Sequence, residues 1–594
     1  MTDVNHMVEI LPDRVKVRAR AGEVLADALI RAGIPVSLYC HKRSICGKCA
    51  VRVRSGLLPL LEAHEKAVLE KRGLGPDHRL ACQFAVRGDL IVELLPESRL
   101  GKIMILESGL DVPVSLEPQV KKFAVTLEKP PLEAPTAVTE VLEALLGPPA
   151  PAVPLAALER LRDLESSQPQ TVTAVVYEER EVLALEPGDT SARACGLALD
   201  IGTSTVVAEL VDLVHGTCLG RASAMNSQAS YGADVVSRLT FAFQNQDNLR
   251  RLRKSIAHLL NELVGELCGK AGVARDAIYE AVAAGNAAMN HFLCGVSTDS
   301  LAVSPFQAVF SSLPPMPAAD LGLDLHPAAR AYIVPNIKSF IGGDITAGLA
   351  AVAMADKPGR ALFVDIGTNG EIVLKNGHDF VATSTAAGPA FEGMSISCGM
   401  LAVEGAVHRA EWRDGGFWLQ TIGQRPPHGL CGTGLIDVLA LALGQGLVRR
   451  DGKIAGPEKK LSLGSRLSLN QNDVREVQLA SAAVKTGVHL LLKECGVPLK
   501  SLDAVYVAGA FGNSLDIRNA QVLGLLPDLP EKKIVFVGNA SLAGARKLLL
   551  SGPERTAAEA LARSITHVSL ASRPDFQDAF VRALGLGTFN GGAS

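Results

Sequence analysis

The chain has 594 residues, more than one hydrophobic core usually organises, so we expect roughly two to four domains. A formal net charge of −3 excludes the overall basic field that binds nucleic acid or an anionic membrane surface. Hydrophobic residues make up 48% of the chain, with 56 glycines and only 2 tryptophans, which is typical of an Ala/Gly-rich α/β protein.

The first residues, MTDVNHMVEILPDRVKV, lack the cationic start and apolar core of a secretory signal. No uncharged apolar run reaches the ~18–20 residues that a bilayer-spanning helix needs. We therefore expect a soluble, cytoplasmic protein. Its 11 cysteines, an odd number, argue against a disulfide framework and favour a metal site or free thiols.

Residues 1–95 predict a small mixed domain. VEILP and RVKVRA alternate apolar and polar residues with the period of a strand, and GEVLADALIRAG then has helical spacing with a glycine stop. After a cysteine-rich loop, KCAVRVRSG, RLACQFAV and GDLIVELL are again typical of strands. A helix on a small mixed sheet, followed by a cysteine loop, resembles the β-grasp fold of ferredoxins.

The cysteine spacing in this domain favours an iron–sulfur centre. Five residues separate Cys40 from Cys46, two separate Cys46 from Cys49, and Cys82 follows after 32 more. Three thiolates on one loop and a fourth from a distant strand suit a [2Fe–2S] cluster, and the five-residue gap resembles the adrenodoxin-like branch. Structural zinc is the alternative, although zinc sites usually pair two close knuckles. Unliganded thiols are a third reading.

Cationic side chains surround these cysteines. His41, Lys42, Arg43 and Lys48 all lie in the stretch CHKRSICGKC. Positive charge here either raises the potential of a cluster or docks an acidic partner. A solvated loop explains the same residues equally well.

Residues 96–118 predict a linker, because PESRLGKIMILESGLDVPVSLEP mixes helical and extended character. Residues 119–193 predict a small α+β middle domain. The prolines of EKPPLEAP and GPPAPAVP interrupt long elements, while KFAVTLE and TVTAVVY are typical of strands. No residue of this region suggests chemistry.

An internal repeat dominates the remainder. Residues 197–210 and 362–375 each form an apolar run that ends in Asp-Ile-Gly-Thr and continues as a second run. The glycine of each copy permits a tight hairpin turn whose amides and hydroxyls face phosphate oxygens. The candidate phosphate-binding residues are Gly202, Thr203, Ser204 and Thr205 in the first copy, and Gly367, Thr368, Asn369 and Gly370 in the second.

Asp200 and Asp365 end the two predicted strands and are expected to face each other across a cleft. Their carboxylates suit Mg²⁺, which binds through one or two carboxylates plus substrate phosphates. Asp344, in GGDITAGL, lies at a predicted helix start, where it either helps to hold metal or attacking water or serves as an N-cap.

A third glycine motif completes the set. AVYVAGAFGNSL is a predicted strand that enters Gly509, Ala510, Phe511 and Gly512, whose backbone can lie against adenine and ribose. Residues 285–295 predict a connecting helix between the phosphate turns. This order resembles the actin, hexokinase and heat-shock chaperone ATPase superfamily, over residues 194–550. The resemblance implies that residues 194–594 form a two-lobed, ribonuclease H-like duplicated ATPase domain that binds ATP.

Two further segments allow alternative readings. In GADVVSRL, Asp234 and Arg238 lie four apart on a predicted helix, which favours an ordinary surface ion pair. In GLCGTGLIDVL, Asp437 either reaches a ribose hydroxyl or follows glycines that serve only close packing.

Together, the quartet of cysteines and the motifs DIGTST, GADVVSR, DIGTNGE and AGAFGN resemble the reductive activators of corrinoid proteins. The resemblance spans the whole chain. It implies ATP-dependent return of Co(II) to Co(I) on a partner protein of a methyltransferase system, with [2Fe–2S] as the relay. It also implies a reduced donor, such as a ferredoxin or flavoprotein, and a homodimer. The corrinoid itself is expected on the partner, because DLHPAA has alanine where a corrinoid-carrier motif has glycine.

Three other functions remain open on the residues alone. A small-molecule kinase with an accessory cluster requires an acceptor pocket and a general base, which no residue clearly supplies. A non-catalytic, ATP-sensing electron carrier requires only binding. An activator of radical dehydratases places its cluster between ATPase subunits, whereas these cysteines lie in a domain of their own.

Overall fold

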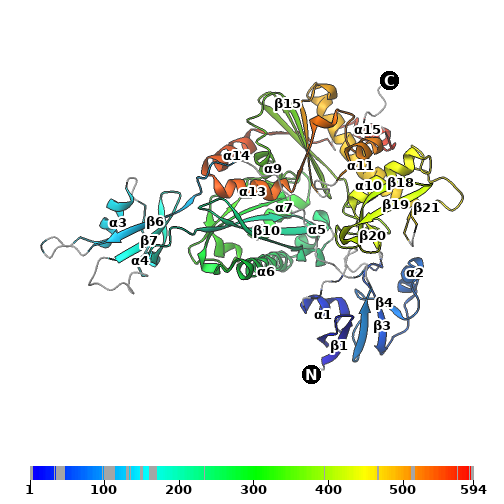
Figure 1. Cartoon of the computed structure of the whole chain (residues 1–594), viewed down its shortest axis with the longest axis horizontal. Helices are drawn as coiled ribbons and strands as arrows, with labels where there is room; N and C mark the ends of the chain where they lie inside the picture. Colours follow the sequence, from blue (N-terminus) through cyan, green and yellow to red (C-terminus); the bar gives the residue numbers. More distant parts are fainter. Residues whose placement is uncertain are drawn as a thin grey trace.

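The chain is a multidomain α/β protein, drawn in Figure 1 as a computed structural model. The structure describes residues 5–32, 34, 36, 44, 47–95, 98, 114–128, 133, 136–147, 151–159, 170–232, 234–393, 395–464, 467–509, 515–570, 573–587 and 589. Most of the predicted linker, 96–118, lies outside them. Within the described ranges, no helix combines the length and the apolar character needed to cross a membrane.

The N-terminal domain is a five-stranded sheet with a packed helix, as the alternating sequence predicts. Its elements are β1 (Asn5–Leu11), β2 (Val15–Arg20), α1 (Leu25–Arg31), β3 (Ala50–Gly56), α2 (Ala63–Lys71), β4 (His78–Leu80) and β5 (Leu90–Leu94). The strand order is β2-β1-β5-β3-β4, and only β1 and β5 run parallel among the described pairs. Leu25 and Leu29 of α1 are fully buried against the sheet. This arrangement is the β-grasp fold.

A second, smaller sheet follows as an antiparallel meander. Its elements are β6 (Val120–Leu127), α3 (Val138–Leu146), α4 (Leu155–Glu159), β7 (Gln170–Tyr177) and β8 (Glu181–Pro187). Leu142 of α3 and Ala157 of α4 pack on Val172 of β7, so both short helices cover the sheet. In Figure 1 this unit and the N-terminal domain lie on opposite sides of the molecule.

The first lobe of the ATPase domain is a six-stranded sheet in the order β11-β10-β9-β12-β14-β13. The strands are β9 (Cys195–Ile201), β10 (Thr205–Asp212), β11 (Cys218–Met225), β12 (Ile278–Gly285), β13 (Met316–Pro317) and β14 (Arg330–Ile333). The helices are α5 (Val235–Gln244), α6 (Gln246–Ala271), α7 (Ala287–Cys294) and α8 (Asp299–Ala302). Every residue of β12 is buried, as a strand covered on both faces requires.

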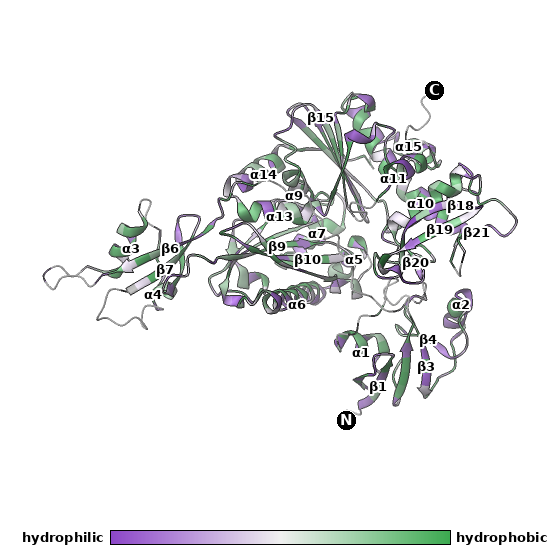
Figure 2. Ribbon diagram, in the orientation of Figure 1, coloured by the Kyte–Doolittle hydropathy of each residue, from purple (hydrophilic) through white to green (hydrophobic). Residues whose placement is uncertain are grey.

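Helix α6 carries the packing pattern of this lobe. Its hydrophobic residues Leu252, Ile256, Leu260, Leu263 and Leu267 recur at helical spacing and pack on the sheet. The opposite face is hydrophilic, and both colours are visible along α6 in Figure 2. Asn245 caps the start of the helix, and Gly272, in the left-handed conformation, ends it.

The second lobe is a six-stranded sheet in the order β24-β23-β15-β16-β17-β25. Its strands are β15 (Arg360–Ile366), β16 (Gly370–Asn376), β17 (Asp379–Thr385), β23 (Ala504–Gly509), β24 (Ile534–Gly538) and β25 (Thr566–His567). Its helices are α10 (Gly432–Gly444), α11 (Gln471–Glu494), α12 (Ile517–Leu523) and α15 (Phe576–Ala583). Two smaller sheets belong to an insertion: β18 (Ala406–Arg413), β19 (Gly416–Thr421) and β20 (Gly429–Leu430), and β21 (Lys460–Ser462) with β22 (Ser468–Asn470).

The two lobes share one topology. In each, three antiparallel strands precede two strands that add in parallel beside the first, so β9, β10, β11, β12 and β14 correspond to β15, β16, β17, β23 and β24. The predicted duplication is therefore confirmed at the level of strand order. It is the arrangement of actin-like ATPases.

Two helices cross between the lobes. Helix α9 (Gly343–Ala351) leaves the first sheet, and its Ile345 and Leu349 pack on Phe363 of the second sheet. Helix α13 (Ala540–Leu550) leaves the second sheet, and its Leu548 packs against the first, where α14 (Gly552–Ser564) follows. The exchange ties the position of each lobe to the other.

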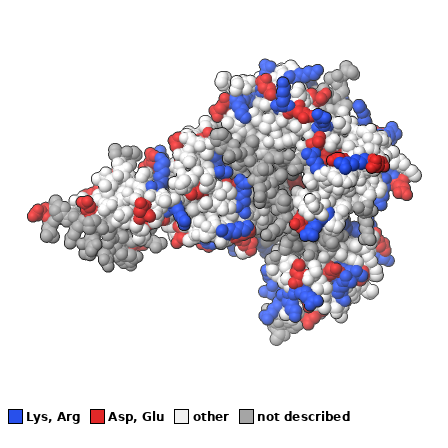
Figure 3. Space-filling view, in the orientation of Figure 1, with Lys and Arg blue, Asp and Glu red and all other residues white. Residues whose placement is uncertain are grey.

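On the face drawn in Figure 3, positive and negative side chains are interspersed over both lobes.

Candidate functional site

The first of the two predicted phosphate turns, a name kept for both, joins β9 to β10. A Cβ at Gly202 would lie 2.7 Å from the carbonyl oxygen of Thr205, so the tight turn requires glycine. Asn226 Nδ2 donates to the Gly202 carbonyl oxygen at 2.8 Å. Asn286, the N-cap of α7, donates from Nδ2 to Thr203 Oγ1 at 3.0 Å. The connecting helix predicted over 285–295 is thus confirmed, and its N-cap residue supports the turn.

Arg238 also holds this turn, which corrects the prediction of a surface pair with Asp234. The Arg238 side chain is 0% exposed and donates from Nη2 to the Thr203 carbonyl oxygen at 2.6 Å. Asp234 instead caps α5 and forms a capping box with Ser237. Burial lowers the pKa of Arg238 to about 10, so the guanidinium remains charged at neutral pH.

The second phosphate turn joins β15 to β16. The Gly367 amide donates to the carbonyl oxygen of Asn369 at 2.9 Å, and the Gly388 amide donates to the carbonyl oxygen of Thr368 at 2.7 Å. A Cβ at Gly367 would meet nothing closer than 3.7 Å, so glycine is less strictly required here than at Gly202. Both predicted hairpins are confirmed by the strand pairing.

A carboxylate that the motifs do not contain joins the two turns. Glu392 Oε2 accepts from Ser204 Oγ at 2.5 Å, and Glu392 Oε1 accepts from Thr368 Oγ1 at 2.7 Å. Ser204 and Thr368 each supply a hydroxyl that the repeat predicts for phosphate oxygens, one from each copy. Glu392 therefore closes a bridge between the lobes at the position where the two phosphate turns meet.

Four further carboxylates gather under the turns. Asp200 and Asp365 are the second-to-last residues of β9 and β15, Asp344 lies in the first turn of α9, and Glu371 lies on β16. Asn539 Nδ2 donates to Asp200 Oδ2 at 2.8 Å. Asp344 is not the N-cap of α9, since that position is Gly342, so this alternative is wrong.

Burial and mutual repulsion favour the neutral form of these groups. Burial, with the charge of Asp365, raises the pKa of Asp344 to about 7. Burial, with the charges of Asp200 and Glu392, raises the pKa of Asp365 to about 7. Burial also raises the pKa of Asp200, and it raises that of Glu371 well above its usual value. A bound cation would reverse these shifts by stabilising the charged forms.

The carboxylates fit a hydrated magnesium ion better than a fully coordinated metal. Within the described part of the chain, no three His, Cys, Asp or Glu side chains are arranged to hold a metal ion by themselves. Mg²⁺ usually retains several waters and takes one or two carboxylates together with phosphate oxygens. The buried acidic cluster beside two phosphate turns meets that requirement.

The predicted adenosine motif begins at Gly509, the last residue of β23. Its φ of 106° is accessible to glycine, and a Cβ would overlap the carbonyl oxygen of Ile366 and lie 2.7 Å from Asp365 Oδ1. Glycine therefore lets β23 end directly beside the acidic cluster. Ala510, Phe511 and Gly512 lie outside the described residues.

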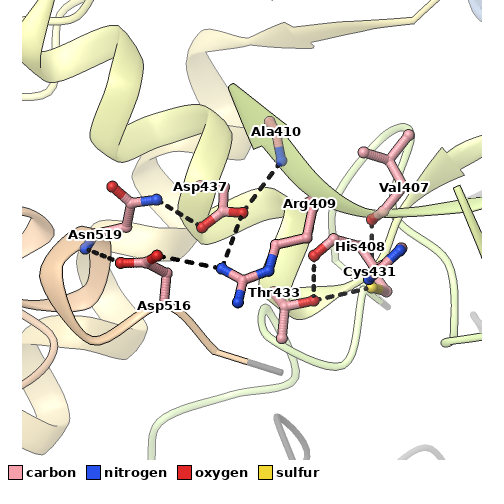
Figure 4. A network of polar contacts seen from close by, with 9 residues as sticks. All are labelled: Val407, His408, Arg409, Ala410, Cys431, Thr433, Asp437, Asp516 and Asn519. Carbon is pink, nitrogen blue, oxygen red and sulfur yellow. Dashed lines mark hydrogen bonds and ion pairs between the residues drawn. The ribbon is translucent and has the colours of Figure 1, made fainter. Parts of the chain in front are cut away.

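Asp437 belongs to a packing network, which supports the close-packing alternative over a ribose contact. A Cβ at Gly434 would overlap the carbonyl oxygen of Val407, so α10 requires glycine to approach β18. Asp437 accepts from the Ala410 amide at 3.1 Å and from Asn519 Nδ2 at 2.7 Å. Arg409 lies between Asp437 and Asp516 in Figure 4.

This network fixes the chain that follows the adenosine motif. Asp516 caps α12 and accepts from Arg409 Nη1 at 3.3 Å, while Asn519 lies in the first turn of α12. The contacts tie α12 to β18 and α10, as Figure 4 shows. Both carboxylate oxygens of Asp437 thus take part in packing contacts among α10, β18 and α12.

Two of the four cysteines lie on neighbouring strand ends of the N-terminal domain. Cys49 precedes β3, Cys82 follows β4, and both side chains are buried. Ala50 pairs with Leu80, and the Ala81 amide donates to the Cys49 carbonyl oxygen at 3.0 Å. The backbone therefore brings the positions of Cys49 and Cys82 to neighbouring strand ends, as a shared cluster requires. Cys40 and Cys46 lie outside the described residues.

The family models divide the chain into four matched parts. Residues 8–87 match the 2Fe-2S iron-sulfur cluster binding domain, and residues 109–192 match the RACo linker region. Residues 195–357 match the RACo middle region, and residues 360–590 match the C-terminal domain of RACo, the ASKHA domain. The first match includes all four cysteines and favours [2Fe–2S] over zinc.

Named relatives match over most or nearly all of the chain. The corrinoid activation enzyme RamQ of Eubacterium limosum is 28% identical over 585 residues, which cover 94% of this chain and 95% of that protein. A [Co(II) methylated amine-specific corrinoid protein] reductase of Methanosarcina barkeri is 28% identical over 428 residues, covering 66% and 77%. A solved structure, a reductive activator for corrinoid, iron-sulfur protein, is 34% identical with a TM-score of 0.74, and the match covers 98% of this chain and 99% of that one.

The matches extend through the cysteine domain, both lobes and the region between them. The chain therefore belongs to the family of reductive activators of corrinoid proteins.

Proposed function

We propose that this protein uses ATP to drive the reduction of a partner corrinoid protein from Co(II) to Co(I), one electron at a time. The observation that carries the proposal is the presence, in one chain, of a ferredoxin-type cysteine domain and a duplicated sheet with two Asp-Ile-Gly-Thr hairpins, in a family named for this activity. The corrinoid belongs to the partner in this proposal.

Cys40, Cys46, Cys49 and Cys82 would hold a [2Fe–2S] cluster, which supplies one-electron transfer when bound. A reduced ferredoxin or flavoprotein would provide the electron that the partner's Co(II) gains. The buried edge between β3 and β4 excludes water from at least the Cys49 and Cys82 positions.

The ATPase domain would bind the nucleotide between its lobes. The turns at 202–205 and 367–370 offer amides and hydroxyls to the phosphates, and Gly509–Gly512 would lie against the adenosine. Asp200 and Asp365 would hold Mg²⁺ through its waters, and Asp344 would orient the attacking water. Burial and the neighbouring carboxylates raise the pKa of Asp344 and of Asp365 when no cation is present, and a bound Mg²⁺ would favour their charged forms, which accept hydrogen bonds from water.

Coupling to ATP hydrolysis would supply the free energy needed to move an electron against the potential gradient. One electron moved against the potential gradient costs about 1.4 kcal/mol for each ~59 mV. Binding coupling between two sites is typically ~1–3 kcal/mol, which covers only a modest gap. We infer that ATP opens or closes the cleft between the lobes and thereby alters binding of the corrinoid partner.

The proposal also includes domain boundaries at residues 95, 118 and 193, and assembly of the protein as a homodimer.

The test is anaerobic mixing of the purified protein, a reductant and a Co(II) corrinoid protein, with and without Mg·ATP. We expect the visible absorption of Co(I) to appear faster with ATP than without it. In the Asp365→Asn variant, the rate of Co(I) formation with ATP is expected to fall about 100-fold, the scale of a lost catalytic group. Equal Co(I) yield without nucleotide would contradict the proposal. ATP turnover that responds to a small metabolite rather than to the corrinoid protein would favour a kinase instead.

A further inference from the structure

Lys48, which lies between Cys46 and Cys49 in the sequence, reaches from the N-terminal domain into the ATPase domain. Its side chain is only 4% exposed. The ammonium donates to the carbonyl oxygen of Gly393 at 2.9 Å and to that of Gly399 at 2.6 Å. A buried ammonium is costly unless it is hydrogen-bonded, so these two carbonyls stabilise the docked domain.

The two acceptors belong to one segment, residues 386–393 and 395–400, which we name the bridging loop. Gly393 has a φ of 76°, and a Cβ there would lie 2.7 Å from the Met400 amide nitrogen. A Cβ at Gly399 would overlap the Gly393 carbonyl oxygen. The loop therefore folds back on itself at two glycines, and this close approach brings both carbonyls within reach of one ammonium.

The first half of the bridging loop is held by the phosphate turns. Glu392, the neighbour of Gly393, accepts from Ser204 and Thr368, and the Gly388 amide donates to the Thr368 carbonyl oxygen. A phosphate group bound by the two turns is anionic, like the Glu392 carboxylate, and competes with it for the same hydroxyl donors. Phosphate bound at the two turns would therefore displace Glu392, which is the neighbour of Gly393, one of the two residues that accept a hydrogen bond from Lys48.

The second half of the loop is fixed elsewhere. Ser397 donates from its amide and from Oγ to Asp473 of α11, both at 2.6 Å. The Met400 amide donates to the carbonyl oxygen of Leu430 at 2.8 Å, on β20, which lies beside the N-terminal domain in Figure 1. Displacement of Glu392 would therefore move Gly393 relative to the anchored half and separate the two carbonyls that share the ammonium.

We propose that Lys48 is a positioning residue that docks the ferredoxin domain on the bridging loop, and that nucleotide phosphates release this domain by displacing Glu392 from Ser204 and Thr368. The inference rests on the proposed function, because release would free the cluster domain to approach a partner. By linkage, a nucleotide that weakens docking binds more tightly once docking is removed.

Two measurements on the full-length, cluster-loaded protein test this inference: hydrogen exchange by mass spectrometry, and the Kd of a non-hydrolysable ATP analogue with Mg²⁺. In the wild type, the analogue is expected to increase amide exchange in residues 47–52. Lys48→Met is expected to show that increase without nucleotide and to bind the analogue about 5-fold or more tightly, the lower end of typical coupling. Lys48→Arg is expected to restore much of the wild-type behaviour.

Lys66→Ala is the matched control, because Lys66 lies in the same domain with a side chain 62% exposed. It is expected to match the wild type in both measurements. Glu392→Gln, which removes the competing charge but leaves Lys48 in place, is expected to tighten analogue binding as well. This variant keeps the inference testable if Lys48→Met folds poorly.

Exchange in residues 47–52 that does not respond to the analogue, or an unchanged Kd in both Lys48→Met and Glu392→Gln, would overturn the docking role. Co(I) yield measured in the same wild-type samples separates this result from failure of the proposed function. ATP-dependent Co(I) formation with unresponsive exchange refutes the Lys48 role alone. Loss of the ATP dependence itself refutes the proposed function.

Discussion

At the scale of single residues, the acidic cluster lowers the stability of the fold when its groups ionise, while the same arrangement favours binding of a cation. Asp344, Asp365 and Glu371 lie close enough for each charge to oppose the others, and burial adds to the effect. Without a cation, ionising these groups destabilises the fold. The same arrangement favours binding of a divalent ion, because the ion relieves the repulsion.

This conflict predicts a pH dependence of stability. The pKa of Asp344 is raised to about 7 from an ordinary value near 3.8, so the folded state binds more protons than the unfolded chain between these values. Its contribution to the free energy of unfolding therefore falls as pH rises through that window. We expect Asp344→Asn to unfold at a higher temperature than the wild type at pH 8, by a margin larger than at pH 5. Calorimetry of the ATPase domain without Mg²⁺ checks this.

Mg²⁺ with nucleotide is expected to raise the wild-type unfolding temperature at pH 8 more than that of Asp344→Asn. A margin between the two proteins that is the same at pH 5 and pH 8 would show that Asp344 ionises normally in the folded state.

Cys82 gives a second prediction at this scale. Its side chain is buried, and it follows β4, whose backbone pairs with β3 next to Cys49. Cys82→Ser is expected to lose most of the bound iron and labile sulfide, together with the visible absorption of the cluster, while nucleotide binding persists. Cys218→Ser is the control, because Cys218 is exposed on β11. Wild-type protein that contained zinc in place of iron would refute the cluster.

At the scale of elements, the crossing of α9 and α13 connects the lobes. Helix α13 packs on α9 so closely that a Cβ at Gly544 would overlap the carbonyl oxygen of Ala347. Backbone-to-backbone contact of this kind leaves no flexible side chain to absorb added volume. The crossing therefore transmits a displacement of one lobe to the other.

Gly544→Ala is expected to destabilise the ATPase domain by about 1–3 kcal/mol, because the added methyl group overpacks the helix crossing. Gly269→Ala is the matched control. Gly269 lies in α6 with nothing within 4 Å of an added Cβ, so the higher helix propensity of alanine should stabilise by about 0.5–1 kcal/mol. Urea denaturation measures both changes. Similar effects of the two substitutions would contradict the packing argument.

At the scale of the whole molecule, Arg555 joins a buried ion pair of the ATPase domain to the small sheet. Arg555 of α14 donates from Nη2 to Glu280 Oε1 of β12 at 2.8 Å and from Nη1 to the hydroxyl of Tyr177, on β7, at 3.2 Å. Glu280 is 0% exposed. Three parts of the chain that are far apart in sequence thus share one guanidinium.

Arg555→Met is expected to cost about 3–5 kcal/mol of stability, because it leaves Glu280 buried without its partner. The double variant Glu280→Gln/Arg555→Met is expected to recover part of this loss, since the unpaired charge is gone. Denaturant unfolding of the single and double variants measures the coupling. A double variant that loses the sum of the two single effects would show that the pair does not interact.

Much of the fold followed from local patterns. Alternation in VEILP and RVKVRA predicted β1 and β2, and the doubled Asp-Ile-Gly-Thr predicted two hairpins, because a strand period and a glycine turn are properties of consecutive residues. The cysteine spacing predicted the ferredoxin domain for the same reason. Helix α2, by contrast, was not predicted, since its sequence has only a weak apolar face.

The sequence by itself determined which strands, turns and thiols exist, because each is encoded within a few neighbouring positions. Only the tertiary structure decided which polar side chains form hydrogen bonds with these strands, turns and loops. Glu392 meets Ser204 across 188 residues, Arg238 meets Thr203 across 35, and Lys48 meets Gly393 across 345. The physical reason is that a polar or charged group buried away from water needs a hydrogen-bonding partner, and that partner determines what the group does. Only folding brings such partners together when they are far apart in the sequence.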